Sequence, residues 1–423
     1  MTKERRDSKN RILGKGEYQK EDGRYMFRYT DLSGKARFVY SWTLTKSDRV
    51  PKDRSPGPCL RDLEKEIFKD LAEEIDTFAA KTNTIDDYFE KYISQKKMIK
   101  DSTRSRYVAL YNLYVKDQIG GRKISSVKFS DIKKYYNDIL SKFNITLSSV
   151  YNINTVLGPI FRLAVRDGLI RTNPVDGALA EIAKELDYTP NKKEALSVQQ
   201  QNAFIDFLTD SAVYSKWRPF FTVMLGTGCR VGEMCGLTWD DCDFTNNVIH
   251  IRRTVYYLRD LNTGKYGLRI QTPKSKSGYR SIPMLNDVRK ILWQERIKQI
   301  QTGFSTEEID GVKGFIFFNS RGKVRIPDNV NNTIHKLISR YNLLEERKAK
   351  EDNREPVFMP EFSSHTLRHT FCTRLCETGI DVKVLQQVMG HSKITTTLDI
   401  YTSVTQEHKT IAFEGIEGKI RIV

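Results

Sequence analysis

Long hydrophobic runs are missing from this chain of 423 residues. No segment approaches the ~18 apolar residues that a membrane-spanning helix needs. The N-terminal stretch MTKERRDSKNRIL also lacks the apolar core of a secretion signal. Cysteine is scarce, and the six cysteines form no CxxC pair. We therefore expect reduced thiols, no membrane partner and a cytoplasmic location.

Motifs that bind nucleotides or metals are missing too. The glycines of LGTGCRVGEMCGLTW, residues 225–239, do not follow the GxGxxG spacing, and the chain has no GK[ST] motif. Cys229, Cys235 and Cys242 lie close together, but no Cys/His pair follows them at zinc-finger spacing. Acidic residues form no dense cluster. These absences predict a protein that works without a cofactor or a metal.

Positive charge is what the chain has in excess. It carries 70 Lys and Arg against 53 Asp and Glu, which gives a formal net charge of +17. Because the charged residues are interspersed along most of the chain, the excess indicates folded basic surfaces rather than a disordered tail. We expect the partner to be a nucleic acid.

Two β-rich runs near the N-terminus, GRYMFRYT and KARFVYSWT, predict a small sheet, and CLRDLEKEIFKDLAEEI predicts an amphipathic helix after it. Alternation places Arg24 and Arg28 on the polar face of the first run. In the second run it places Arg37 opposite an apolar face made by Phe38, Tyr40 and Trp42. We interpret Arg24, Arg28 and Arg37 as one DNA-binding face. A solvated sheet face without a partner is the alternative.

The middle of the chain is predicted to be helical. SDIKKYYNDILSKF predicts a helix capped by Ser130, and residues 147–167 predict a second helix that ends at Gly168. From about residue 195, helices alternate with the strands NVIHIRRTVYYL and YRSIPM. TPKSKSG lies between these strands and predicts a lysine-bearing hairpin turn, for which both Lys274 and Lys276 are candidates.

The stretch SSHTLRHTFCTRL, residues 363–375, predicts a helix that begins at a serine cap. Its apolar residues recur every fourth position and predict a buried stripe, whereas His365 and Arg368 share a flank and His369 lies one turn beyond His365. Cations at a helix N-terminus oppose the macrodipole, so we expect an anionic partner there. A zinc site and a structural histidine pair are alternatives, but the glutamate of a zincin helix is absent.

Further polar residues are ambiguous when they are taken singly. Arg230 is followed by Glu233 on one helix face, and by itself this pair indicates a surface ion pair. His391 follows a glycine in VMGHSKITTTLDIYTSV, and Tyr401 comes ten residues later. Alone, Tyr401 indicates a packing residue.

In combination, the order Arg-x-x-Glu, a hairpin Lys, His-x-x-Arg-His, Gly-His and Tyr resembles the catalytic domain of the tyrosine recombinases, or phage-type integrases. The resemblance covers about residues 195–405. It implies that Arg230 and Arg368 are the paired arginines, that Lys276 is the hairpin lysine, and that Tyr401 is the nucleophile. It implies catalytic roles for His365 and His391 as well.

The layout of the whole chain is similar to that of conjugative-transposon integrases. That likeness implies a multidomain α+β fold. Residues 1–76 would be a three-stranded sheet plus a helix that binds arm-type DNA, and residues 80–185 a helical core-binding domain. Residues 195–423 would be a mainly helical catalytic domain with a small antiparallel sheet and a C-terminal tail.

The resemblance implies a site-specific DNA recombinase that integrates and excises a mobile element through a 3′-phosphotyrosine and a Holliday junction. Its partners would be double-stranded attachment sites of core and arm type, further copies of itself from dimer to tetramer, and an accessory excision or bending protein. It would be associated with the nucleoid during recombination. A DNA-binding regulator with a degenerate catalytic domain and a type IB topoisomerase are the alternatives.

The tail, residues 405–423, carries apolar residues at Ile416, Ile420 and Ile422. Their common parity predicts a strand that is added to a sheet edge. The strand would pack on its own domain or be exchanged with a neighbouring subunit, and the sequence leaves both open.

Overall fold

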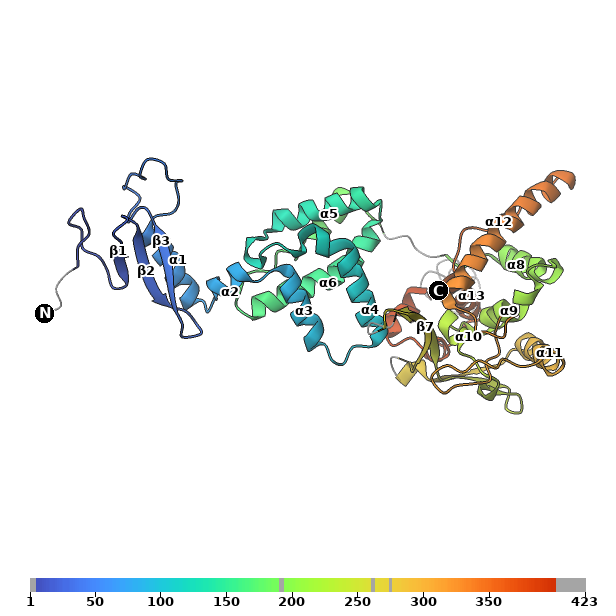
Figure 1. Ribbon diagram of the computed structural model, residues 1–423. Coiled ribbons are helices and arrows are strands. Elements are labelled where there is room, and N and C mark those ends of the chain that lie inside the picture. The colour runs from blue at the N-terminus through green and yellow to red at the C-terminus, as the bar shows by residue number, and fades with distance from the viewer. Residues whose placement is uncertain (1–4, 190–193, 260–262, 274–275, 401–423) are drawn as a thin grey trace, which may run out of the picture. The chain divides into compact units, whose positions relative to one another are not determined.

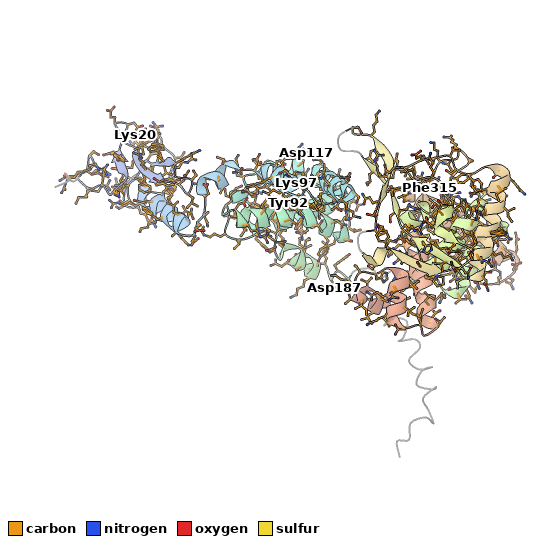
Figure 2. All side chains as sticks on the ribbon, turned by 90° about the horizontal axis from the view of Figure 1, so that it is seen from below. Lys20, Tyr92, Lys97, Asp117, Asp187 and Phe315 are labelled. Carbon is orange, nitrogen blue, oxygen red and sulfur yellow. The ribbon has the colours of Figure 1, made fainter. Side chains whose placement is uncertain are left out.

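A computed structural model describes the chain except for residues 1–4, 190–193, 260–262, 274–275 and 401–423. The chain divides into two compact units, Met1–Pro190 and Asn191–Val423 (Figure 1). Figure 2 shows Phe315 within the second unit, where its side chain is fully buried, and Lys20 at the surface of the first. Within the described ranges, no helix is long and apolar enough to cross a membrane.

The first unit begins with a small antiparallel sheet. Strands β1 (Glu17–Gln19), β2 (Tyr25–Thr30) and β3 (Ala36–Ser41) are paired in that order, and helix α1 (Leu60–Ala72) packs against β2 and β3. The residues between sheet and helix that form the core are Leu13, Tyr25, Phe27, Leu44, Leu60 and Ile67. The predicted sheet and helix are confirmed.

The register of this sheet corrects the predicted arginine face. Arg28 pairs across the strands with Phe38, whereas Arg37 pairs with Tyr29. Arg37 therefore lies on the face opposite Arg28, where its Nε donates to Asp31 at 2.7 Å. Phe38 is 48% exposed, so the face predicted to be apolar is open to solvent at this position. The prediction failed because the pairing register, which the turn between the strands determines, decides which side chains share a face.

The rest of the first unit is helical around a core of its own. Its α-helices are α2 (Thr77–Thr82), α3 (Ile85–Gln95), α4 (Asp101–Leu110), α5 (Phe129–Phe143), α6 (Leu147–Arg166) and α7 (Ala178–Glu185), and the π-helix η1 (Tyr111–Gly120) continues α4. The cap predicted at Ser130 is wrong, because the N-cap of α5 is Lys128, two residues earlier, and its backbone N–H donates to the Asp131 carboxylate at 2.9 Å. The predicted stop of α6 is confirmed by Gly168, which adopts φ +68°.

The second unit is mainly helical and carries two small sheets. Its helices are α8 (Val198–Asp210), α9 (Arg218–Thr227), α10 (Val231–Cys235), α11 (Asn286–Thr302), α12 (Pro327–Glu351), α13 (Ser364–Glu377) and α14 (Val382–Met389). Its strands are β4 (Cys242–Asp243), β5 (Val248–Ile251), β6 (Thr254–Arg259), β7 (Tyr266–Gln271) and β8 (Arg280–Pro283). The sheets have the orders β4-β5-β8 and β6-β7.

Strand β7 was not predicted, and its presence changes which strands the lysine turn connects. The single strand predicted over NVIHIRRTVYYL is two strands, β5 and β6, in different sheets. TPKSKSG then leads from β7 of one sheet to β8 of the other, so the prediction of a hairpin turn is wrong. The alternation of Tyr266, Leu268 and Ile270 with polar residues or glycine was the signal that would have indicated β7.

Candidate active site

Helix α13 presents Arg368 to the interior of the second unit. The helix follows Ser363 as its N-cap, and Leu367 and Phe371 of the predicted stripe are buried. Arg368 is itself only 2% exposed. Its Nη1 donates to the carbonyl of Gly228 at 2.6 Å, and its Nη2 donates to the carbonyl of Met389. The arginine thus connects the end of α9 to the end of α14.

A left-handed glycine brings Arg230 to the same place. Helix α9 ends at Thr227, and Gly228 adopts φ +60°, where a Cβ atom would lie 2.4 Å from the Phe371 ring. The chain then enters α10 with Arg230 as its N-cap. The Arg230 Nη1 donates to Glu233 Oε1 at 2.8 Å, and the Arg230 backbone N–H donates to Oε2 at 2.8 Å. The predicted pairing of Arg230 with Glu233 is confirmed.

A third arginine, Arg280 at the start of β8, joins this cluster, and sequence reasoning missed it. Its Nη1 and Nη2 donate to the two carboxylate oxygens of Glu233 at 3.1 and 2.8 Å. Its Nε donates to the carbonyl of Val388 at 2.8 Å. The spacing of Arg280 four residues after Lys276 was visible in the sequence, but nothing local indicates its partners.

The C-terminal end of α14 gathers all three arginines. The carbonyls of Val388 and Met389 accept from Arg280 and Arg368, and the carbonyl of Gly390 accepts from Arg230 Nη2 at 3.3 Å. The negative end of a helix macrodipole favours cations at this position. The arginine cluster, defined as Arg230, Arg280 and Arg368, therefore surrounds one helix end, and among the described residues Glu233 is the carboxylate with which it forms ion pairs.

The cluster resembles an anion-binding site, and comparison with known proteins shows to which family the chain belongs. The model of the phage integrase family matches residues 194–408, and one described as the DNA binding domain of Tn916 integrase matches residues 1–71. The chain belongs to the phage integrase family. It is a tyrosine site-specific recombinase, as the sequence predicted.

Two relatives match this recombinase over nearly its whole length. The transposases of transposon Tn916 from Enterococcus faecalis and of Tn1545 from Streptococcus pneumoniae are each 33% identical to it over 405 residues, which is 96% of this chain and 95% of theirs. Among solved structures, the Tn1549 transposon integrase in complex with transposon right end DNA is 30% identical. That match has a TM-score of 0.66 and covers 78% of this chain and 100% of that one. The predicted fold class is confirmed.

His391 follows directly on α14, and the arginines shape its electrostatics. Its Nδ1 lies 3.0 Å from Thr397 Oγ1, and its carbonyl accepts from Gln386 Nε2 at 3.0 Å. Burial and the nearby guanidinium of Arg368 lower the pKa of His391 to about 4, and His365 contributes in the same direction. The imidazole of His391 is therefore neutral at physiological pH, and His365, exposed at the start of α13, lies within its electrostatic reach.

Among the described residues, the arginine cluster carries more positive charge than its carboxylate partner Glu233 can neutralise. Burial, and after it the charge of Arg230, lowers the pKa of Arg368 to about 9. Burial opposes the ionisation of Glu233, but hydrogen bonds from Arg280 and the charge of Arg230 outweigh it and lower the pKa of Glu233 to about 2. One carboxylate cannot neutralise three guanidiniums, so an anion that enters is stabilised.

The lysine turn of the recombinase passes close to His391. A Cβ atom on Gly390, which adopts φ +64°, would lie 2.8 Å from the carbonyl oxygen of Ser277. The backbone of the turn Lys276–Gly278 is thus beside the end of α14, although the side chain of Lys276 is not described. Lys274, Tyr401 and the tail lie outside the described residues.

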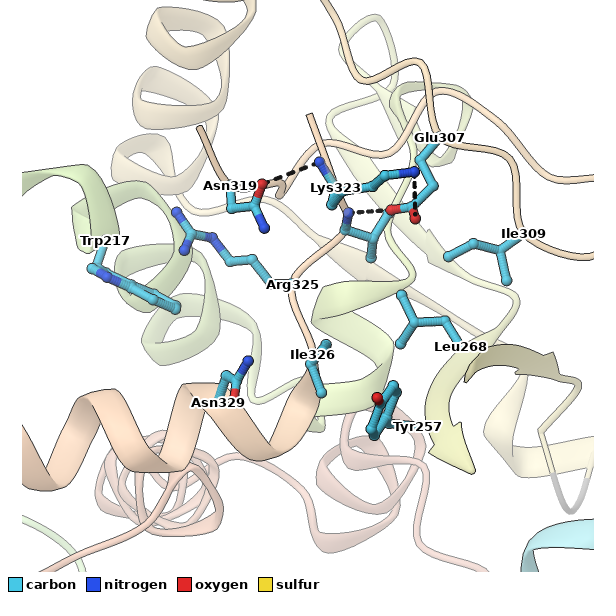
Figure 3. Close-up of a pocket in the computed structure, with 11 residues that line it drawn as sticks. Trp217, Tyr257, Leu268, Glu307, Ile309, Asn319, Lys323, Arg325, Ile326 and Asn329 are labelled. Atoms are coloured by element: carbon cyan, nitrogen blue, oxygen red, sulfur yellow. Dashed lines mark hydrogen bonds and ion pairs between the residues drawn. The ribbon is translucent and has the colours of Figure 1, made fainter. Parts of the chain in front are cut away.

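Two other features of the recombinase lie outside this cluster. His369 lies on the same helix as Arg368, and within the described parts of the chain no group of three His, Cys, Asp or Glu could hold a metal ion. A separate hollow of about 470 Å³ lies where the guanidinium of Arg325 stacks 3.7 Å over the ring of Trp217 (Figure 3). No residue of the arginine cluster lines that hollow.

Proposed function

We propose that this recombinase cuts and rejoins the ends of a conjugative mobile element and its target, and so integrates and excises the element. The observation that carries the proposal is the arginine cluster beside a neutral His391. Phosphoryl transfer depends mainly on cations that are positioned to meet developing negative charge. Further support comes from the similarity to the transposases of the transposons Tn916 and Tn1545.

In the proposed reaction, Arg230 and Arg368 bind the two non-bridging oxygens of one DNA phosphate. A guanidinium fork matches two such oxygens, which an ammonium does not. The Tyr401 oxygen attacks phosphorus and loses its proton to His365. The phosphorus–tyrosine bond forms as the bond to the 5′-oxygen breaks, which leaves a 3′-phosphotyrosine. Attack by a 5′-hydroxyl of the partner strand reverses these steps.

The leaving 5′-oxygen needs a proton, and Lys276 is proposed to donate it. Lys274 is the alternative within the same segment. His391, neutral because of the arginines around it, is proposed to donate a hydrogen bond to the phosphate. The covalent intermediate retains the energy of the broken bond, so religation requires neither a cofactor nor a metal ion.

We propose that residues 1–76 bind arm-type sites, that residues 80–185 bind the core site, and that residues 195–423 perform the chemistry. The separate hydrophobic cores within the chain support this division. Exchange between two duplexes, each cut on both strands, needs four nucleophiles, which indicates a tetramer assembled from dimers on DNA. An accessory excision or bending protein would set the direction, and these substrates imply work on the nucleoid in the cytoplasm.

The decisive experiment uses a nicked duplex that carries an end of the mobile element encoding the chain. Loss of the short fragment beyond the nick traps the covalent adduct, which is detected on a denaturing gel. Wild-type protein should form the adduct, and Tyr401→Phe should bind the same duplex but form none. EDTA should change nothing. Inhibition by EDTA that Zn²⁺ reverses would instead support a histidine metal site.

The same experiment separates the alternative functions. A DNA-binding regulator would shift the duplex without forming an adduct. A type IB topoisomerase would also relax supercoiled plasmids that lack the element ends. Adducts at wild-type yield in Tyr401→Phe would contradict the assignment of the nucleophile.

A further inference from the structure

Arg280 lies outside the set of residues to which the resemblance assigns roles, yet it contacts three parts of the site. We propose that Arg280 is a positioning residue: it holds Glu233, the end of α14 and the lysine turn in place, so that Arg230 stays directed at the phosphate. This inference rests on the proposed function, because it concerns the alignment of the same site.

Arg230 and Arg280 both pair with Glu233, but their side chains differ in exposure to solvent, which indicates different roles. The side chain of Arg280 is 4% exposed and that of Glu233 is 3% exposed, whereas the side chain of Arg230 is 41% exposed. Arg230 can therefore meet a ligand from solvent. Arg280 is enclosed by protein, and the hydrogen bonds already described occupy its Nε and both terminal nitrogens.

The hydrogen bonds of Glu233 show how Arg280 acts on Arg230. Oε1 accepts from the Nη1 atoms of both arginines, and Oε2 accepts from Arg280 Nη2 and from the Arg230 backbone. The fork of Arg280 thus occupies both carboxylate oxygens. Without it, the buried carboxylate would have only Arg230 to neutralise it, and a bidentate Arg–carboxylate pair is the favoured geometry. The Arg230 fork would then turn toward Glu233 and away from the phosphate.

Arg280 also contacts the segments that carry His391 and Lys276. Its Nε bonds the carbonyl of Val388, and its Nη1 lies 3.4 Å from the carbonyl of Gly278. A Cβ atom on Gly390 would lie 3.1 Å from the Cδ of Arg280, so the turn before His391 packs directly on this side chain. A lysine at position 280 has three N–H donors on a single nitrogen, and one atom cannot occupy the separate positions of Nε, Nη1 and Nη2 from which Arg280 makes these bonds.

The test compares Arg280→Lys with wild type on the nicked duplex at saturating protein. We expect the single-turnover rate of adduct formation to fall by about 10-fold to 10²-fold, the range for loss of alignment at one transition-state donor. The Kd for the duplex should change by less than about twofold, because Arg280 does not face the ligand. The matched control is Arg354→Lys, which breaks a bidentate pair with Glu345 in the same unit and should leave the rate unchanged.

Two readouts separate positioning from a merely structural role. If Arg280 acts through Glu233, the double variant Arg280→Lys with Glu233→Gln should cleave no more slowly than Glu233→Gln alone. The acid limb of the rate profile should also move to higher pH in Arg280→Lys, because Glu233 is then held ionised by Arg230 alone. His391 also titrates at acidic pH and could contribute to the acid limb of the rate profile. The variant His391→Gln identifies its contribution.

A wild-type rate in Arg280→Lys would overturn the inference, and so would losses that multiply in the double variant. A loss confined to thermal stability, with the rate at saturation and the acid limb unmoved, would overturn it as well. Failure of the wild-type protein to form any adduct would instead overturn the proposed function, and the inference with it.

Discussion

At the scale of single residues, the three clustered arginines donate to three successive carbonyls but differ in their exposure to solvent and in their other partners. Arg230 is open to solvent, and Arg280 and Arg368 are buried. Arg368 donates to two carbonyls and forms no ion pair with a carboxylate in the part of the chain that the structure describes. Its hydrogen bonds hold together the ends of α9 and α14, and its charge adds to the positive potential of the cluster.

Replacement by lysine should distinguish Arg368 from Arg230. Both Arg368→Lys and Arg230→Lys should slow cleavage by about 10²-fold, because each loses one fork at the transition state. Only Arg368→Lys should also lower the melting temperature, since the single nitrogen of a lysine cannot fill the two positions from which Nη1 and Nη2 donate to Gly228 and Met389. Each hydrogen bond to a charged group contributes about 2 kcal/mol. Single-turnover cleavage and thermal melting measure the two effects. Near-normal cleavage by both variants would contradict the site.

His391 should titrate at unusually low pH for a histidine. Its pKa in the fold is about 4, below the usual value near 6.5, so the unfolded chain binds more protons between these values. The contribution of His391 to stability is thus present at neutral pH and is lost as the pH falls from about 6.5 toward 4. NMR titration of the histidine ring signals measures the pKa of His391, whose signal is the one that is lost in His391→Gln.

An oxyanion should reverse that depression. Vanadate bound among the arginines would neutralise part of the charge that disfavours the imidazolium, so the pKa of His391 should rise when vanadate is added. Arg230→Gln should reduce the rise. A pKa near 6.5 without the anion, or no response to it, would show that the arginines do not act on His391.

At the scale of elements, the sheet of the first unit has one covered face and one open face. The helix α1 covers Tyr25 and Phe27, and the open face carries Arg28, Phe38 and Tyr40. Arg24 stands just before β2, paired with Asp22 and 5.5 Å from the centre of the Tyr40 ring. If this sheet docks on DNA, the open face is the one that can do so.

Alanine at the two faces gives a matched test. Arg28→Ala should weaken binding to arm-type DNA and lower the dependence of log Kd on log salt by about 1, as expected for one lost phosphate contact. Arg37→Ala should leave both unchanged, because Arg37 already pairs with Asp31. Binding isotherms at several salt concentrations measure both the Kd and its dependence on salt. Equal losses from the two variants would mean that the sheet contacts DNA in some other way.

At the scale of the whole molecule, the recombinase must couple its chemistry to assembly on two duplexes. Its net charge of +17 favours binding to DNA, but charge alone does not keep four nucleophiles from reacting together. The tail after Tyr401, with its apolar residues Ile416, Ile420 and Ile422, is the segment that we propose to be exchanged between subunits.

Truncation after Glu414 tests the exchange. It should leave binding to a single core site intact, because no residue of the arginine cluster is removed. It should abolish synaptic complexes or release cleavage from control, as seen by native gels and by adduct yield on paired sites. A truncated protein that recombines normally and forms complexes of wild-type size would show that the tail packs on its own domain.

Much of this protein follows from local patterns in its sequence. The helix over residues 364–377, the pairing of Arg230 with Glu233 and the motif order that indicates a tyrosine recombinase depend on residues a few positions apart. Helical periodicity and capping make such features readable, because the interacting groups are neighbours along the chain.

Other features were decided only by tertiary structure. Arg280 meets Glu233 across 47 positions and Val388 across 108, so no local pattern could reveal it. The side of the sheet on which Arg37 lies depends on strand register, since a shift of one residue reverses every side chain. The pKa of His391 likewise depends on arginines that come from α10, β8 and α13. The sequence alone determined which chemical groups are present, and long-range packing decided which of them meet.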